Sequence, residues 1–151
     1  MSYLPWLAGG AVAGYALRRG RRGALLPPWL GRGKVVENIW NRSLDADAIL
    51  EDDEFAWTWI EIMLPIDALP QIGPDYYATL TKEDLAAEPA RNQEIKQWMM
   101  RVGGPKPALH ESPVLVAWDG ERLTLLDGGH RLKVAKELGA TATTALVGIG
   151  G

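Results

Sequence analysis

The chain has 151 residues, of which 47% are hydrophobic and 23% are charged, so it is long enough for one globular core and a small appendage. It contains no cysteine, which excludes a disulfide framework, a thiolate metal site and chemistry that needs a thiolate nucleophile. Residues 1–36 hold six cations and no acid, whereas the remainder holds ten cations and nineteen acids. Non-specific DNA binding is driven by positive charge, so a DNA function would depend on the N-terminal segment.

Residues 1–36 are predicted to form an apolar and basic arm. The fifteen uncharged residues Tyr3–Leu17 precede a run of four arginines within Arg18–Arg22. A membrane-spanning helix needs about 20 apolar residues, and a secretory signal carries its positive charges before the apolar stretch, so neither description fits. Three interpretations of residues 3–22 remain: peripheral membrane association, contact with another protein or DNA, or a poorly ordered tail. We expect a cytoplasmic protein, peripheral to the membrane under the first of these interpretations.

Residues 37–56 are predicted to be an acidic connector between the arm and the main domain. Ser43 is suited to cap a short helix that extends to Leu50. The acidic residues of this region lack the glycine and the spaced oxygen ligands of a calcium loop, which favours a solvated acidic face. These residues are Asp45, Asp47, Glu51, Asp52, Asp53 and Glu54.

The domain proper is predicted to span residues 57–151 and to begin with a strand over Trp57–Leu64. Alternation along this strand places Glu61 on the same face as Trp57 and Trp59. Burial beside these rings would raise the pKa of Glu61 and make it a candidate general base. The alternative is that Glu61 pairs with an arginine at the edge of the sheet.

Two helices are predicted next along the chain. Thr81 begins a sequence that resembles a capping box, Pro89 is expected to interrupt the first helix, and Gln93–Arg101 is expected to form the second. Two short strands then follow, Val114–Trp118 and Arg122–Leu126, joined by a tight turn of the Asp-Gly type.

The most informative segment is Asp127–Arg131, between the second strand of this hairpin and a short helix. Gly128 and Gly129 allow a close backbone approach, and the free N–H groups of a first helical turn attract anions. The helix has one apolar stripe and ends at Gly139, after which a further β-branched strand is expected over residues 141–147. This arrangement favours a phosphate site, and the alternative for the two glycines is a plain strand-to-helix turn.

The run from Leu125 to Gly139 resembles the D-G-x-H-R-x-x-A-x-x-x-x-G signature of the ParB/sulfiredoxin-like superfamily. Three further segments resemble that family in the same order: Ile62–Leu69, the arginine-then-helix segment from Arg91 to Val102, and Ser112–Val116. The resemblance covers residues 57 to 148. It implies an α+β fold, with a small mixed β-sheet and flanking helices.

The resemblance also implies a nucleotide site whose phosphates lie at Gly128, Gly129, His130 and Arg131, with Arg91 as a second phosphate contact. Members of this family bind CTP or use ATP, so the expected ligand is ATP or CTP with Mg²⁺. Sulfiredoxin chemistry is excluded because the chain has no cysteine.

Each residue of the loop has a second interpretation. Arg131 is expected to hold phosphate or to form a surface ion pair. His130 is expected to donate to a phosphate or transfer a proton, or to bond only to the backbone. Asp127 is expected to hold Mg²⁺ or accept a proton from an attacking hydroxyl, or to cap the helix.

Two functional classes follow from these observations. In the first, the domain binds a nucleoside triphosphate and hydrolyses it or transfers a phosphoryl group to a small acceptor, with Asp127, His130 or Glu61 as catalytic residues. In the second, it is a non-catalytic binding module or a DNA-associated accessory protein of the ParB-like kind found in phages and plasmids, and its basic arm makes the contact.

Overall fold

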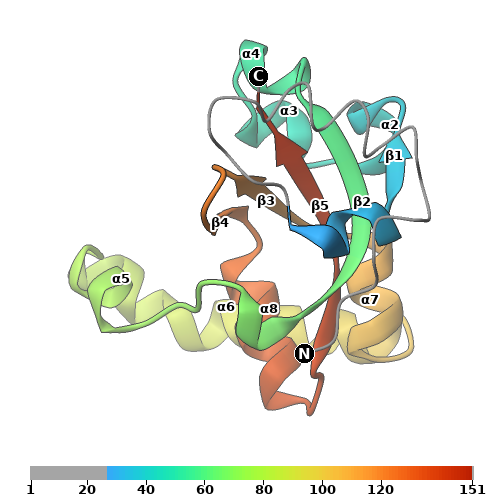
Figure 1. The fold of residues 1–151 in the computed structure, drawn as a ribbon. Helices are drawn as coiled ribbons and strands as arrows, with labels where there is room; N and C mark the ends of the chain where they lie inside the picture. Colours follow the sequence, from blue (N-terminus) through green and yellow to red (C-terminus); the bar gives the residue numbers. More distant parts are fainter. Residues whose placement is uncertain (1–26, 151) are drawn as a thin grey trace.

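The computed structural model describes residues 27–150, which form an α+β fold around a five-stranded mixed sheet (Figure 1). The strands lie in the order β1-β2-β5-β3-β4, and only β3 and β5 are parallel. They are β1 (Lys34–Val36), β2 (Thr58–Pro65), β3 (Val114–Trp118), β4 (Leu123–Asp127) and β5 (Ala142–Ile149). The α-helices are α2 (Ile39–Arg42), α3 (Ala46–Ile49), α4 (Asp52–Phe55), α5 (Pro74–Ala78), α6 (Lys82–Arg101), α7 (Pro105–Glu111) and α8 (Gly129–Glu137). Two 3-10 helices, η1 (Pro28–Arg32) and η2 (Ile66–Ala68), complete the described part. The α+β class and the mixed sheet expected from the sequence are confirmed.

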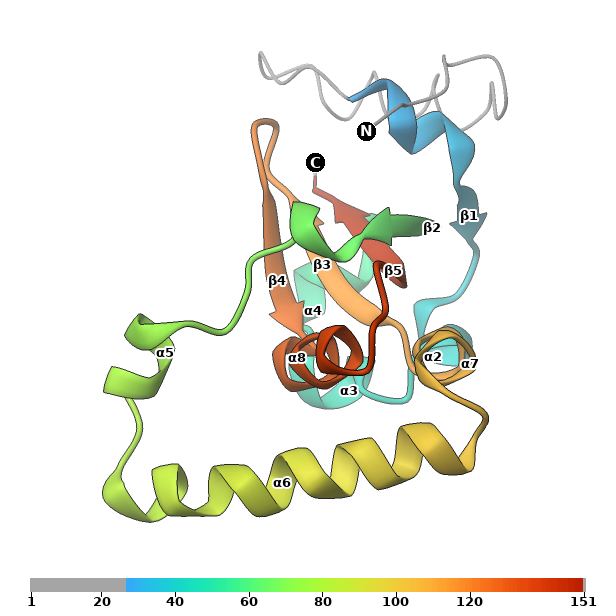
Figure 2. The same ribbon diagram turned by 90° about the horizontal axis from the view of Figure 1, so that it is seen from below.

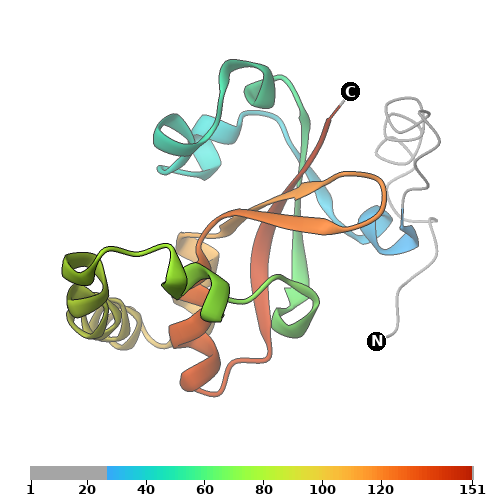
Figure 3. The same cartoon turned by 90° about the vertical axis from the view of Figure 1, so that its left-hand side faces the viewer.

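The helices lie on both sides of the sheet. Helices α7 and α8 cover one face, and α6 runs along the outside of these two helices (Figure 2). The short helices α2, α3 and α4 cover the opposite face, away from α5 and α6 (Figure 3). Within residues 27–150, no helix is both long enough and apolar enough to cross a membrane.

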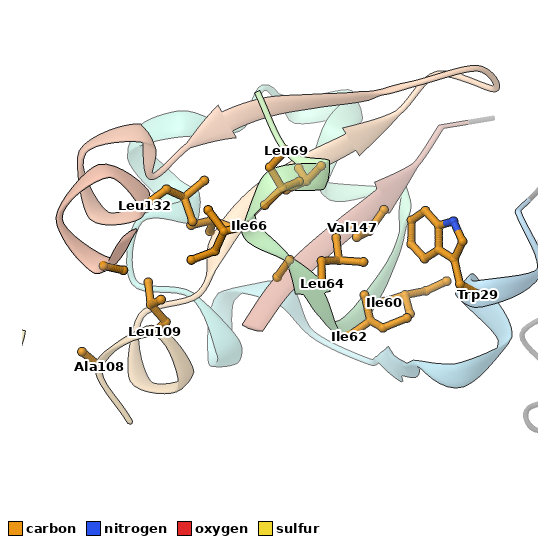
Figure 4. Close-up of a cluster of buried hydrophobic side chains, with 14 of the residues drawn as sticks. Trp29, Ile60, Ile62, Leu64, Ile66, Leu69, Ala108, Leu109, Leu132 and Val147 are labelled. Carbon is orange, nitrogen blue, oxygen red and sulfur yellow. The ribbon is translucent and has the colours of Figure 1, made fainter. Parts of the chain in front are cut away.

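Alternation along the strands produces two separate apolar clusters, one on each face. On β2, Ile60, Ile62 and Leu64 belong to the larger cluster, which includes side chains of α7 and α8, while Trp59 belongs to the smaller one. Figure 4 shows the larger cluster extending from Leu132 of α8 across the sheet to Trp29 of η1. The alternation predicted for the strand over residues 57–64 is confirmed.

The segment from the hairpin to the last strand agrees closely with the prediction. The turn between β3 and β4 is closed by Asp119, whose carboxylate accepts hydrogen bonds from the backbone amides of Glu121 and Arg122. Helix α8 ends at Glu137, Gly139 follows with a φ of +91°, and the Ala140 amide donates to the Ala135 carbonyl at 2.9 Å. This 6→1 hydrogen bond is characteristic of a Schellman cap.

The interruption predicted at Pro89 is wrong, because α6 is one continuous helix of 20 residues. Thr81 caps it as predicted, since its hydroxyl accepts the Asp84 amide at 3.0 Å. The fixed φ of proline is compatible with a helix, and the carbonyl left without a donor belongs to Leu85, a residue that is 48% exposed. Water can therefore replace the missing intrahelical hydrogen bond.

The region predicted as an acidic connector contributes to the same fold. Strand β1, which ends at Val36, pairs with β2. Ile39, Ala46 and Leu50 are buried against the sheet. Ser43 follows α2 and makes no N-cap for α3, whose N-cap residue is Asp45. The predicted boundary at residue 57 thus does not separate two structural units within residues 27–150. The arm interpretations that concern residues 3–22 lie outside the described residues.

Candidate functional site

The candidate site lies where β4 ends and α8 begins. Gly128 occupies the N-cap position of α8 with φ +110° and ψ 13°, a conformation that side-chain-bearing residues rarely adopt. A Cβ atom at this position would lie 2.5 Å from Cγ1 of the buried Val114 and 3.0 Å from the Arg131 guanidinium. Gly128 is therefore required both by backbone conformation and by the close approach of β3.

The first turn of α8 carries three backbone N–H groups without an internal partner. The first helical hydrogen bond runs from the Leu132 amide to the Gly128 carbonyl at 3.0 Å. In the described part of the chain, the amides of Gly129, His130 and Arg131 donate to no acceptor. Such amides carry the partial positive charge of a helix N-terminus. No side chain caps this end of the helix, so the capping alternative for Asp127 is not observed.

These residues line a cavity of about 470 Å³ between α8 and α6. The wall on the α8 side consists of Asp127–Arg131, and Ser112 contributes from the segment before β3. Helix α6 supplies two charged and two apolar side chains, Arg91, Glu94, Ile95 and Trp98. A cavity of this size, with an apolar wall and convergent polar groups, is typical of small-ligand sites.

The Arg131 guanidinium is held by acceptors of the protein itself. It donates to Asp45 at 2.9 Å, to Asp127 at 3.3 Å and to the Pro113 carbonyl at 3.2 Å. Its side chain is only 14% exposed, and its buried Nε atom has no partner among the described residues. The ion-pair interpretation of Arg131 is therefore realised in the structure, although its guanidinium is more deeply buried than in a surface pair.

Asp127 is half-buried at the end of β4, and burial raises the pKa of its carboxyl group. The positive charge of Arg131 opposes this rise, whereas the neighbouring Asp45 carboxylate adds to it. Two carboxylates thus share one guanidinium beside the cavity. A negative charge at close range disfavours ionisation of the Asp127 carboxyl group.

His130 is buried and points toward α6 through its Nε2 atom. This nitrogen lies 2.9 and 3.0 Å from the two carboxylate oxygens of Glu88, and the Tyr76 hydroxyl lies 3.5 Å away. His130 therefore joins α8 to α6, and its partner is a buried acid instead of the backbone.

Arg91 is the cationic group of the cavity that has no ion-pair partner within residues 27–150. It is exposed on α6, three residues after Glu88, which places both side chains on the side of α6 toward α8. Arg91 and the three residues that carry these amides thus line one cavity.

Glu61 lies in a different cavity, of about 300 Å³, together with Arg32, Lys34 and His110. Its carboxylate is bonded to the Arg42 guanidinium, which lowers its pKa, and Lys34 and His110 lower it further. The predicted rise in the pKa of Glu61 is wrong, because the ion pair outweighs the effect of burial. The arginine-paired alternative is confirmed, and the structure does not bring Glu61 to the Asp127 cavity.

Sequence reasoning missed two site residues, Asp45 and Glu88. Asp45 was assigned to a solvated acidic face, and it lies 86 positions before the arginine that it binds. Glu88 was hidden by the predicted break at Pro89. An acid three residues before Arg91 was the one available signal for it, because this spacing places both on one helix face.

The residues present suit Mg²⁺ only in combination with a phosphate ligand. Within residues 27–150, no three His, Cys, Asp or Glu side chains are grouped to hold a metal ion. Magnesium is commonly bound by one or two carboxylates together with substrate phosphates, and Asp127 provides such a carboxylate. The chemistry of the donor set therefore fits a metal that arrives with its ligand.

Comparison of the chain with protein-family models, curated proteins and solved structures finds no match in any of the three.

Proposed function

We propose that this domain binds a nucleoside triphosphate, ATP or CTP, with the phosphate groups in the cavity between α8 and α6. One observation carries the proposal: three consecutive amides at the start of α8 have no internal acceptor, and their residues line a cavity large enough for a ligand. Phosphate groups are the ligands that such a helix end favours most. The resemblance of the Asp127–Arg131 loop to the ParB/sulfiredoxin-like signature and the mixed sheet support the same ligand class.

In this proposal each polar group of the cavity has a defined role. The amides of Gly129, His130 and Arg131 donate to phosphate oxygens, and the unpaired Arg91 neutralises charge from the α6 side. The side chains of Ile95 and Trp98 offer an apolar surface to the rest of the ligand.

The acidic groups around the cavity favour a magnesium complex over a free triphosphate. Asp127 and Glu94 line the cavity, and Asp45 lies next to Asp127. A bare triphosphate would meet these carboxylates, whereas Mg²⁺ would offset the repulsion while held by Asp127 and phosphate oxygens. We therefore expect nucleotide affinity to depend on Mg²⁺.

Turnover is the second part of the proposal. Asp127 acts in turnover either as the Mg²⁺ ligand or as the acceptor of a proton from an attacking water or hydroxyl, and its raised pKa suits the second role. His130 contributes by holding α8 against α6, because its Nε2 atom is bonded to Glu88. The product is a hydrolysed nucleotide or a phosphorylated small acceptor.

Isothermal titration with ATP, CTP and GTP, with and without Mg²⁺, tests the proposal. At least one nucleotide is expected to bind in the presence of Mg²⁺, and Arg91→Ala is expected to weaken this binding by about tenfold, because one charge-assisted contact is lost. Arg101→Ala is the matched control, since it removes an exposed arginine from the same helix outside the cavity. Absence of heat with every nucleotide, or equal weakening by both variants, would contradict the proposal.

A further inference from the structure

The ion pairs of Arg131 suggest how access to the proposed phosphate site is controlled. The guanidinium, which the sequence motif associates with phosphate, already donates to two carboxylates and one carbonyl. An anion that enters the cavity meets a cation whose charge is more than balanced by Asp45 and Asp127. Three of its N–H donors are already used and its Nε atom is buried, so an anion competes with these carboxylates for the guanidinium.

Asp45 is the carboxylate that can be released more easily. Its side chain is 41% exposed, whereas that of Asp127 is 27% exposed and is fixed at the end of β4. Asp45 precedes α3, a helix of four residues on the opposite face of the sheet from α6. Release of Asp45 from Arg131 therefore disturbs less packing than release of Asp127, which would require a shift of β4.

The local structure of α3 does not need the Asp45 carboxylate. Asp45 is the N-cap residue of α3, yet its side chain makes no capping hydrogen bond. The carboxylate instead reaches Arg131 at 2.9 Å, across 86 positions of the chain. Its role in the described structure is thus the contact with Arg131.

We propose that Asp45 is a gate residue that holds Arg131 away from anionic ligands until the ligand displaces it. Displacement of Asp45 frees Nη1 of the guanidinium for a phosphate oxygen of the ligand. The inference deepens the proposed nucleotide site and rests on it for the identity of the ligand. The raised pKa of Asp127, to which Asp45 contributes, is consistent with this crowding of carboxylates.

The gate is tested by two independent measurements on the full chain. The first is the rate at which phenylglyoxal modifies Arg131, followed by peptide mass spectrometry with exposed Arg101 as an internal reference. The second is the affinity for Mg·ATP and Mg·CTP by isothermal titration. Both are made on the wild type, Asp45→Asn and the matched control Asp47→Asn, which removes one acidic charge from the same short helix without touching Arg131. Asp45→Ala provides a second variant if Asp45→Asn does not fold.

The gate predicts that phenylglyoxal modifies Arg131 faster in Asp45→Asn than in the wild type. It also predicts that Asp45→Asn binds the nucleotide at least about threefold more tightly than the wild type, because one competing charge-assisted bond is lost. Asp47→Asn is expected to behave as the wild type. Unchanged modification, or faster modification with unchanged or weaker nucleotide affinity, would overturn the gate while leaving nucleotide binding intact. Faster modification without nucleotide binding by any variant would overturn the proposed function and support Asp45 as the group that shields Arg131.

Discussion

Substitution of Gly128 by alanine tests the geometry that places α8 and Arg131 beside the cavity. The φ of +110° at this residue imposes a backbone penalty of about 1–2 kcal/mol on a residue with a side chain. The new Cβ atom would also lie 2.5 Å from Cγ1 of Val114, which is fully buried in β3 and has no room to move. Overpacking of this kind costs about 1–3 kcal/mol, so we expect a total destabilisation of about 2–5 kcal/mol.

Urea and thermal unfolding measure this effect, and Gly139→Ala is its matched control. Gly139 has a φ of +91°, but a Cβ atom there meets nothing within 4 Å, so that variant bears the backbone penalty alone. Gly128→Ala is expected to lower Tm by about 8–20 °C, at roughly 4 °C for each kcal/mol in a domain of this size. The two variants should differ by about 1–3 kcal/mol, which is the cost of the clash. Equal destabilisation would refute the close approach of Val114 to the loop.

Two further substitutions test the ion pairs. Glu88→Gln is expected to destabilise the protein by about 2 kcal/mol in urea unfolding, because His130 loses its buried carboxylate partner; an effect below about 0.5 kcal/mol would contradict that role. Arg42→Met is expected to destabilise at pH 7 because Arg42 holds the pKa of Glu61 below its ordinary value. A lowered carboxyl pKa adds stability above the unfolded pKa of about 4.3, and this contribution is lost as pH falls through the lowered value. The difference between wild type and Arg42→Met should therefore shrink as the pH falls below about 4.3, whereas a constant difference would show that Glu61 does not titrate against Arg42.

Local sequence patterns were sufficient to predict the hairpin, α8 and its caps. The turn residues near Gly120 and the terminating Gly139 act within a few positions, so their conformations follow from the chain itself. The same holds for Gly128, where a close backbone approach was expected at the strand-to-helix junction. The loop that was expected to hold phosphate lines a cavity.

The electrostatic partners of the loop could not be predicted in the same way. Asp45 and Glu88 reach Arg131 and His130 across 86 and 42 positions, and the spacing of Glu88 from Arg91 was the one local signal for either acid. The continuity of α6 was missed because proline was expected to break a helix at any internal position. The free-energy cost of an internal proline is smaller where the carbonyl that loses its donor faces water. Tertiary packing therefore determined both the partner of Arg131 and the face of α6 that lines the cavity.

The central claim is that the first turn of α8 binds the phosphate groups of a nucleotide. The most direct measurement is a titration of ¹⁵N-labelled protein with Mg·ATP and Mg·CTP, followed through the backbone amide resonances. The account predicts that the amides of Gly129, His130 and Arg131 show the largest and saturable shifts, with smaller changes around Arg91. Saturable shifts confined to another region, or no shifts at millimolar nucleotide, would contradict it.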